Sequence, residues 1–251
     1  MTKIASFYSF HRGTGKSTII VNLAALKAMD GSRVGIIDTG FQSPSIQILL
    51  DLDDDDIPYT LNDYLWNKCD IEQCAYDMTS SLGGETKGKL HIIPSSTSAV
   101  EIMTLMKTGY STELLNTGIG DICSALELDY LFIDTHAGIN EETLLALALS
   151  DAAGIILRFD NQDYQGTAIT VGLAQTLEVP NIQLVLNQIP PDLPAKVARK
   201  QAKEGFGLEV ASVIPHSNDV LQLGSSKILS VAYPNHPVTA LFREVFAHLL
   251  G

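Results

Sequence analysis

The chain has 251 residues, 45% of them apolar, and its 29 acidic against 16 basic residues give a formal net charge of −13. This length and apolar content suffice for one large α/β domain with a full core, so we predict a single domain over residues 1–251. The acidic surface repels polyanions, which counts against tight nonspecific binding to DNA or to anionic membranes. The sequence has no 18-residue apolar run and no signal-peptide pattern, which predicts a cytoplasmic protein with no stable membrane insertion.

Apolar runs alternate with helical patterns along the whole chain. The runs predict strands near residues 3–9, 33–38, 89–94, 129–134, 153–159, 181–188 and 209–214. Two stretches, 130–133 and 154–157, are apolar throughout, which is typical of strands covered on both faces. The pattern predicts an α/β fold with a doubly wound, mostly parallel sheet of about seven to eight strands and helices on both faces.

Neither the polar segment 51–88 nor the cysteines show the residue spacing of a metal or redox site. The polar segment 51–88 is expected to form loops, and its acidic run at 53–56 lacks the ligand spacing of a calcium loop, so we interpret it as a solvated turn. Cys69, Cys74 and Cys123 match no zinc or redox spacing, so we expect reduced and mostly buried thiols.

Residues 10–18 have the pattern of a phosphate-binding loop between the first strand and a helix predicted over 19–29. Gly13 and Gly15 lack a Cβ, so the backbone can curl with its N–H groups toward one anion, and the helix start adds the positive end of its dipole. The residues that we assign to nucleotide binding in this loop are His11, Arg12, Gly13, Thr14, Gly15, Lys16, Ser17 and Thr18.

Individual side chains of this loop point to magnesium-dependent phosphate chemistry. Lys16 is placed to reach the β- and γ-phosphates, and the Ser17 hydroxyl to ligate Mg²⁺. Asp134 ends the strand at 129–134, where it can hold the water shell of the ion opposite Ser17. The loop departs from the usual pattern at Phe10, where a glycine normally stands.

Several polar residues fall at the ends of predicted strands. Asp38, Asp134 and Asn187 each end a strand, as does the phosphate loop. Ligands of doubly wound sheets bind at the carboxyl ends of the strands, so we expect these groups to converge on one edge.

Together these motifs resemble the ParA/MinD family of deviant Walker-box ATPases, which are SIMIBI-like P-loop NTPases, over essentially the whole chain. The matching segments are 11–18, 34–39, 134–138, 186–188 and 213–215, with 158–167 matching one bacterial subgroup. The resemblance implies an Mg-ATP-dependent switch that forms a face-to-face homodimer around two ATP molecules and is released by hydrolysis. It further implies that Asn187 contacts adenine, that Pro215 forms the other side of that pocket, and that the protein positions or partitions a cargo with a protein activator or adaptor.

The chain departs from this family at two functional positions. The family's signature lysine, five residues before the loop lysine, is His11 here, and the adjacent Arg12 is the cation that could replace it. The family's second acidic residue, two after Asp38, is Gly40, which predicts slow hydrolysis. We assign catalytic roles to Lys16, Asp38 and Arg12, and the metal site to Ser17, Asp38 and Asp134.

Other functions remain open from the sequence. Gly40 and His11 also suit a nucleotide-bound scaffold or adaptor that does not hydrolyse ATP, and an ATP-dependent biosynthetic ligase is a weaker alternative. A basic helix face at Lys196, Arg199, Lys200 and Lys203 could contact nonspecific DNA, although a solvated face is commoner. The apolar positions of the C-terminal stretch 241–250 favour packing on the sheet over a membrane-surface helix, because its polar face is not basic.

Overall fold

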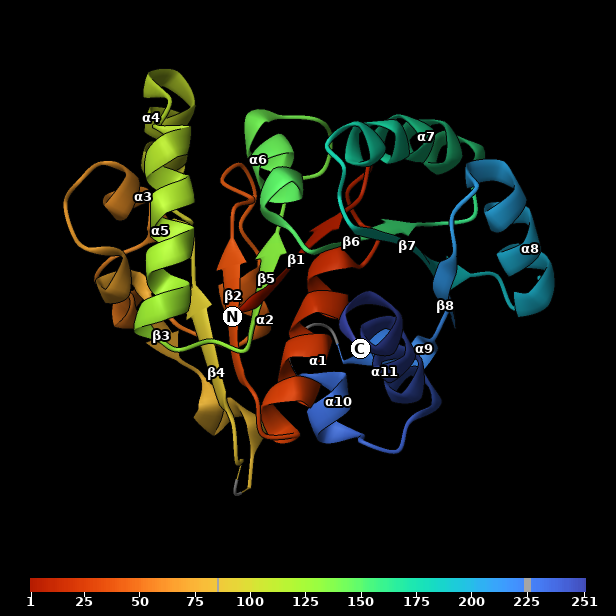
Figure 1. Cartoon of the computed structure of the whole chain (residues 1–251). Helices are drawn as coiled ribbons and strands as arrows, with labels where there is room; N and C mark the ends of the chain where they lie inside the picture. The colour runs from red at the N-terminus through yellow and green to blue at the C-terminus, as the bar shows by residue number, and fades with distance from the viewer. Residues whose placement is uncertain (85, 224–226) are drawn as a thin grey trace.

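The computed structural model describes residues 1–84, 86–223 and 227–251. Within these ranges eight strands form one sheet in the order β3-β4-β2-β5-β1-β6-β7-β8 (Figure 1). The strands are β1 (Lys3–Tyr8), β2 (Arg33–Asp38), β3 (Tyr76–Asp77), β4 (Lys89–Ile93), β5 (Tyr130–Asp134), β6 (Ala152–Leu157), β7 (Asn181–Ile189) and β8 (Val210–Pro215). All pairings are parallel except that of β3 with β4. The predicted doubly wound α/β sheet is therefore confirmed.

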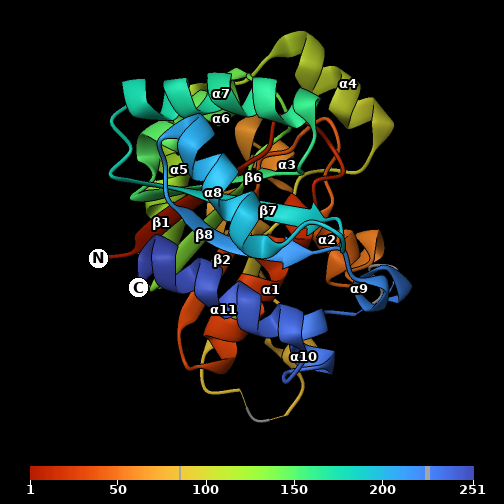
Figure 2. The same ribbon diagram turned by 90° about the vertical axis from the view of Figure 1, so that its right-hand side faces the viewer.

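Helices cover both faces of this sheet. The helices are α1 (Lys16–Met29), α2 (Ile46–Leu49), α3 (Leu61–Leu65), α4 (Ala99–Thr108), α5 (Thr112–Ala125), α6 (Glu141–Leu149), α7 (Asn161–Thr176), α8 (Ala195–Phe206), α9 (Asn218–Gln222), α10 (Leu229–Ala232) and α11 (Pro237–Leu250). Figure 2 shows α1 and α11 below the sheet and α7 above it.

The larger part of the core lies between the sheet, α1 and α11. Nine of the fourteen residues of α1 are buried, because the sheet covers one side of this helix while α10 and α11 cover the other. On α11, Phe242, Val245 and Leu249 are buried in the same cluster. The prediction that the C-terminal helix packs on the sheet is confirmed. Among the described residues, no helix has both the length and the hydropathy needed to span a membrane.

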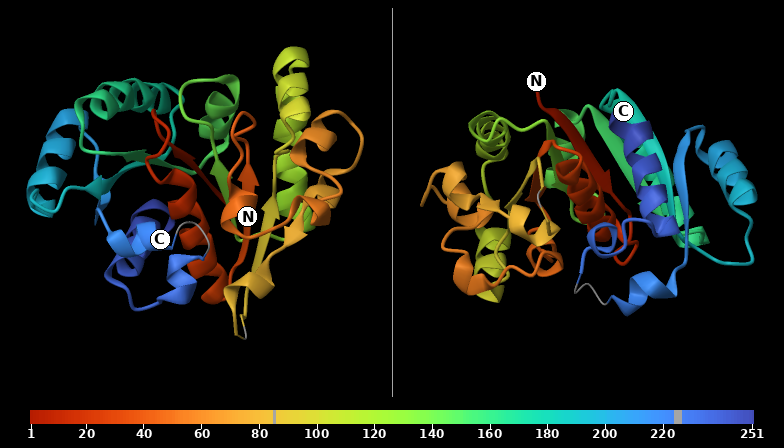
Figure 3. Two further views of the ribbon diagram at one scale, coloured as in Figure 1. Left: turned by 180° about the vertical axis from the view of Figure 1, so that it is seen from behind. Right: turned by 90° about the horizontal axis from the view of Figure 1, so that it is seen from below.

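The segment 51–88, expected to be loop-like, also contains short regular elements. It contains α3, β3 and three short 3-10 helices, η1 (Asp54–Asp56), η2 (Ile71–Cys74) and η3 (Thr79–Leu82), while residue 85 lies outside the described ranges. Leu61 and Ile71 are buried in one cluster with residues of α5, and the view from behind in Figure 3 shows this segment beside that helix. Elements this short leave too few residues for a recognisable period, so the sequence pattern missed them.

The cysteines and the acidic run match their expectations. All three cysteines are free, with Cys74 and Cys123 buried and Cys69 partly exposed. The sulfur atoms of Cys69 and Cys74 lie 3.5 Å apart, which their sequence spacing did not indicate. Within the acidic run, Asp53, Asp55 and Asp56 are exposed.

Candidate functional site

The strand order brings three polar segments to one edge of the sheet. β2, β5 and β1 are consecutive neighbours, and in this register Asp134 pairs with Asp38 on one side and with Phe7 on the other. Because these strands are parallel, the loop after β1 starts beside both carboxylates. The expected convergence at the carboxyl edge is therefore present.

The backbone of the loop bends at two glycines. Gly13 and Gly15 have φ angles of 76° and 86°, a region that residues with a Cβ rarely adopt. A Cβ on Gly15 would also lie only 2.4 Å from Nδ2 of Asn187, an atom that donates a hydrogen bond to the Thr14 carbonyl at 2.6 Å. Gly15 stands in the N-cap position of α1 without a side-chain cap, so the positive end of this helix faces the loop.

At the start of α1, the carboxylate of Asp134 contacts both Lys16 and Ser17. The Lys16 ammonium contacts Oδ1 of Asp134, and the Ser17 hydroxyl donates to Oδ2 at 2.6 Å. The Ser45 hydroxyl lies 2.9 Å from that of Ser17. Burial lowers the pKa of Lys16 to about 8, although the nearby charge of Asp38 opposes this shift. A buried cation and a hydroxyl at a helix start together suit an anion with a bound metal ion.

The carboxylate of Asp38 holds the loop that follows β2. Its oxygens accept the backbone N–H groups of Gly40 at 2.8 Å, of Ser45 at 2.9 Å and of Ile46 at 3.3 Å. Burial raises the pKa of Asp38, while these bonds and the charge of Lys16 pull it back. A Cβ on Gly40 would lie 2.9 Å from Asp38 Oδ1. The observed role of this carboxylate is thus to shape the loop over residues 39–46.

These groups line a cavity of about 350 Å³, called here the phosphate cavity, whose lining includes charged and hydroxyl side chains. Its lining includes Arg12, Gly13, Thr14, Gly15, Lys16, Ser17, Thr18, Asp38, Gly40, Ser45, Asp134 and His136. Its geometry is that of a phosphate site: a curled glycine loop, a helix start, one buried lysine and hydroxyls beside carboxylates.

Comparison with known protein families shows which family this chain belongs to. The CobQ/CobB/MinD/ParA nucleotide-binding domain matches residues 6–231, which is most of the chain. This chain belongs to that family. The membership confirms the resemblance to ParA/MinD proteins, and it makes the chain a P-loop protein of a nucleotide-binding family.

Individual relatives are more distant. An uncharacterised ATP-binding protein of Methanocaldococcus jannaschii is 27% identical over 95% of this chain and 84% of its own length. The septum site-determining protein MinD of Pyrococcus horikoshii, solved with Mg-ADP, has a TM-score of 0.78 and 19% identity, covering 98% of this chain and 94% of that one. MinD in a MinC:MinD complex of Aquifex aeolicus has a TM-score of 0.76 and 17% identity over 97% and 93% of the two chains. At these identities the structures share the fold.

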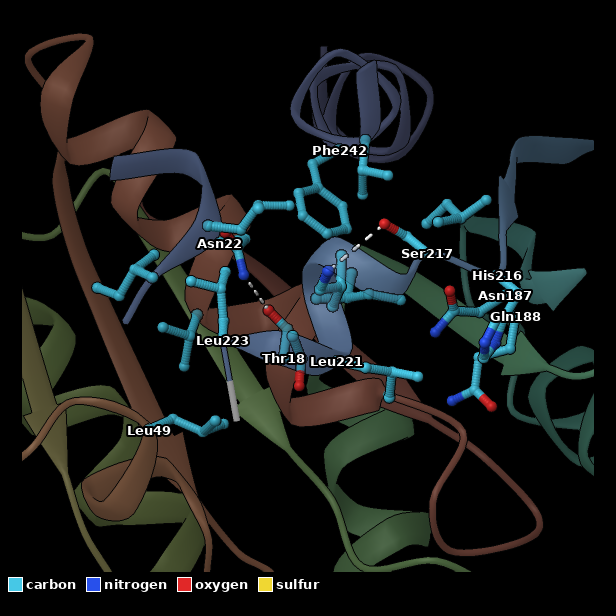
Figure 4. A pocket seen from close by; sticks show the side chains of 18 of the residues that line it. Thr18, Asn22, Leu49, Asn187, Gln188, His216, Ser217, Leu221, Leu223 and Phe242 are labelled. Carbon is cyan, nitrogen blue, oxygen red and sulfur yellow. Dashed lines mark hydrogen bonds between the residues drawn. The ribbon is translucent and has the colours of Figure 1, made fainter. Parts of the chain in front are cut away.

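A second, mostly apolar cavity of about 250 Å³ adjoins the phosphate cavity of this family member (Figure 4). Gly15 and Thr18 line both cavities. Asn187 and Pro215, the two residues expected beside a base, lie in its wall, and Phe242 closes it from α11. The family resemblance implied the positions of Asn187 and Pro215 beside the base, whereas neither the resemblance nor the sequence pattern indicated that the C-terminal helix reaches this cavity.

His11 occupies the family's signature-lysine position, and Arg12 follows it. The two side chains point in different directions. Arg12 lines the phosphate cavity, and its Nη2 lies 3.1 Å from Nε2 of His136 in the turn after β5. His11 is not among the residues that line the phosphate cavity, and its Nδ1 lies 2.5 Å from Oδ1 of Asp163 on α7. Of the loop residues assigned from the sequence, His11 is the one that is absent from the lining of the phosphate cavity.

Sequence reasoning missed three residues that contact the site. Ser45 joins Ser17 to the loop after β2, His136 contacts Arg12, and Gln188 donates through Nε2 to the Gly13 carbonyl at 2.9 Å. His136 and Gln188 lie at or just after the ends of β5 and β7, so strand-end position could have found these two. Ser45 lies seven residues beyond the end of β2, at the N-cap of α2, and had no such signal.

The basic residues of α8 are largely engaged within the chain. Lys200 pairs with Glu204 at 3.8 Å, Lys203 contacts Glu209, and Arg199 donates to a backbone carbonyl of β8. Neighbouring carboxylates reduce the positive potential of this face, which counts against the DNA-contact hypothesis.

Proposed function

We propose that the chain is an ATP-dependent dimerisation switch of the ParA/MinD type, which positions or partitions an intracellular cargo and hydrolyses ATP slowly. The observation that carries this proposal is that the phosphate cavity, with its charged side chains, meets the mostly apolar cavity at Gly15 and Thr18. A nucleotide has the same two halves, a charged phosphate chain and a largely apolar base. The relative position of the two cavities also fits a nucleotide, because it places the phosphates at the start of α1 and the base beside Asn187.

In the proposed complex, Lys16 exchanges Asp134 for the β- and γ-phosphates, while the loop backbone and the start of α1 bind the phosphate oxygens. Ser17 ligates Mg²⁺ directly and Asp134 holds its water shell, since hard oxygen ligands suit this ion. The 2.6 Å contact between these two side chains supports a shared ion position. Asp38 acts on this site by holding Ser45 against Ser17.

The base is proposed to occupy the apolar cavity. One amide hydrogen of Asn187 already binds the Thr14 carbonyl. Its second hydrogen and its oxygen remain for the acceptor and donor edge of adenine, which is the pairing that an amide side chain can make. Pro215 supplies the opposite wall.

Slow hydrolysis is proposed from the residues around the γ-phosphate position. Gly40 provides no carboxylate to orient water. Both oxygens of Asp38 accept backbone N–H groups, so this carboxylate is a poor substitute. Arg12 is the candidate cation for charge developing on the γ-phosphate, because it lines the cavity and carries a permanent charge.

A face-to-face homodimer is supported by apolar side chains at the same edge. Ile48 on α2 is 61% exposed and lines the phosphate cavity, and Ile139, just before α6, is 46% exposed. A second copy would cover both residues and contact nucleotide held by the first. ATP then shifts the monomer–dimer equilibrium by its differential affinity for the dimer. A protein activator or cargo adaptor is proposed as a further partner, since MinD of Aquifex aeolicus forms a complex with another protein, MinC.

A second candidate is a nucleotide-bound scaffold that hydrolyses no ATP. The engagement of Asp38 by three backbone N–H groups and the lack of a side chain at Gly40 favour it. It shares every binding step with the switch and differs only in turnover. A steady-state ATPase assay, with and without DNA, separates the two functions.

The experiment that tests the proposal is size-exclusion chromatography with light scattering in Mg-ATP, in Mg-ADP and without nucleotide. We expect a dimer in Mg-ATP and a monomer without nucleotide. Lys16→Ala is the control, since loss of its cation should abolish ATP binding in calorimetry and leave the variant monomeric. The same mass in all three conditions refutes the switch, and unchanged ATP affinity in Lys16→Ala refutes the phosphate assignment.

A further inference from the structure

The segment that precedes and begins α7 holds a buried carboxylate against the phosphate loop. Asp163 is 1% exposed. Its Oδ2 accepts the backbone N–H and the Nε of Arg158, both at 3.0 Å, and its Oδ1 lies 2.5 Å from Nδ1 of His11. Burial by itself would raise the pKa of Asp163, but the hydrogen bonds from Arg158 and His11 outweigh it and lower the pKa. The carboxylate is therefore ionised and bound on both oxygens.

A second contact docks the loop one turn further along α7. A Cβ on Gly166 would lie 2.0 Å from Cδ1 of Phe10, so the phenyl ring packs directly on the helix backbone. The rings of Phe10 and His11 meet edge to face, with centroids 5.0 Å apart. The two loop residues that depart from the common pattern are thus both accommodated by α7.

We propose that Asp163 is a positioning residue for nucleotide binding, which fixes the start of the phosphate loop on α7 through His11. This inference rests on the proposed function. Two glycines make residues 13–15 costly to order, and a loop anchored at its start loses less conformational entropy when phosphate binds. His11 is then a contact within its own chain, and it is unavailable to reach a partner's phosphates.

His11 and Arg158 bind different oxygens of this carboxylate. The backbone N–H and the Nε of Arg158 both donate to Oδ2 of Asp163, and its Nη2 also lies 3.4 Å from Oδ2 of Asp160, whereas His11 is the partner of Oδ1. The contact with His11 spans 152 residues of sequence and ends on a loop whose next residue lines the phosphate cavity. A substitution of Asp163 can therefore alter the position of the loop that contains Gly13 and Gly15.

The test is a double-mutant cycle on Mg-ATP affinity with Asp163→Asn, His11→Ala and the double variant, measured by titration calorimetry. Each single variant should weaken binding about tenfold, as expected for loss of one hydrogen bond to a charged group. The double variant should bind no more weakly than either single one, because both act through one contact. A merely structural effect of Asp163 would keep its full size in the His11→Ala background.

Asp160→Ala serves as the matched control. The Asp160 side chain caps α7 by accepting the N–H groups of Gln162 and Asp163, and it pairs with Arg158 at 3.4 Å, but these contacts do not include the loop. Its removal should lower the melting temperature by roughly 2–4 °C and leave Mg-ATP affinity unchanged.

Three outcomes overturn the inference: parental affinity in Asp163→Asn, parental affinity in His11→Ala, or fully additive losses. Because His11 is partly exposed, His11→Ala decides the matter even if Asp163→Asn does not fold. If the parent chain itself binds no Mg-ATP, the proposed function fails and this inference fails with it. If the parent binds and the variants match it, the inference alone is wrong.

Discussion

The guanidinium of Arg12 lies 3.1 Å from Nε2 of His136, joining the phosphate loop to the turn after β5. A guanidinium only donates hydrogen bonds, so His136 accepts through an unprotonated Nε2 and is neutral in this contact. The pKa of His136 is lowered by burial and further by the charges of Arg12 and Lys16, which agrees with a neutral ring. The contact holds a permanent cation beside the cavity without compensating its charge.

Arg12→Ala should weaken ATP-dependent dimerisation without raising turnover. The variant loses the cation proposed to reach phosphate, a charge-assisted contact worth about 1.5–3 kcal/mol. Sedimentation equilibrium in Mg-ATP measures the effect. His136→Ala is the comparison, since it keeps the charge of Arg12 and should perturb the dimer less. Equal dimer stability in Arg12→Ala and the parent would remove Arg12 from the proposed site.

Gly15→Ala should reduce ATP affinity much more than Gly13→Ala. Both glycines have positive φ angles, so each substitution carries a similar backbone strain of about 1–2 kcal/mol. Only at Gly15 would the new Cβ also collide, at 2.4 Å from Nδ2 of Asn187, whereas nothing lies within 4 Å of a Cβ on Gly13. Calorimetric titration with Mg-ATP compares the two. Similar losses in both variants would mean that the contact with Asn187 does not constrain the loop.

Gly40→Asp should raise the ATPase rate while leaving ATP affinity within a few-fold, as expected for a group that acts mainly in the transition state. The new Cβ would lie 2.9 Å from Asp38 Oδ1, so part of the gain is offset by crowding and by repulsion between carboxylates. Gly40→Ala and Gly40→Asn carry the crowding without the charge and should stay slow. If Gly40→Asp is as slow as these controls, position 40 does not limit turnover.

The free energy of unfolding should fall as pH drops below about 6.5, the ordinary pKa of histidine. Burial lowers the pKa of His91 in the folded chain, so the unfolded chain binds its proton more readily. Stability is then retained above the unfolded pKa and lost as pH falls toward the lower pKa of the folded chain. Urea titrations at pH 7.5 and 5.5 measure the loss, and His91→Gln should reduce it. If the free energy of unfolding of His91→Gln falls as much as that of the parent, other groups cause the pH dependence.

The sequence by itself determined the parallel sheet and the position of its binding edge. Strands buried on both faces need continuous apolar runs, and a glycine loop between a strand and a helix has a local pattern, so both are visible in short windows. Asp38, Asp134 and Asn187 could be placed at one edge because parallel strands share a direction. β3 and the short helices of residues 51–88 were missed, since elements of two to five residues show no period.

Only the tertiary structure decided what the unusual loop residues contact. In the sequence, His11 stands where the family has its signature lysine, and Phe10 stands where the common loop pattern has a glycine. In the fold, His11 meets Asp163 and Phe10 meets Gly166, contacts that span more than 150 residues. Such pairs depend on how α7 crosses the end of β1, which no local periodicity encodes. The same holds for Phe242, which reaches the apolar cavity from the last helix. Helix packing, rather than chain order, sets which side chains complete the site.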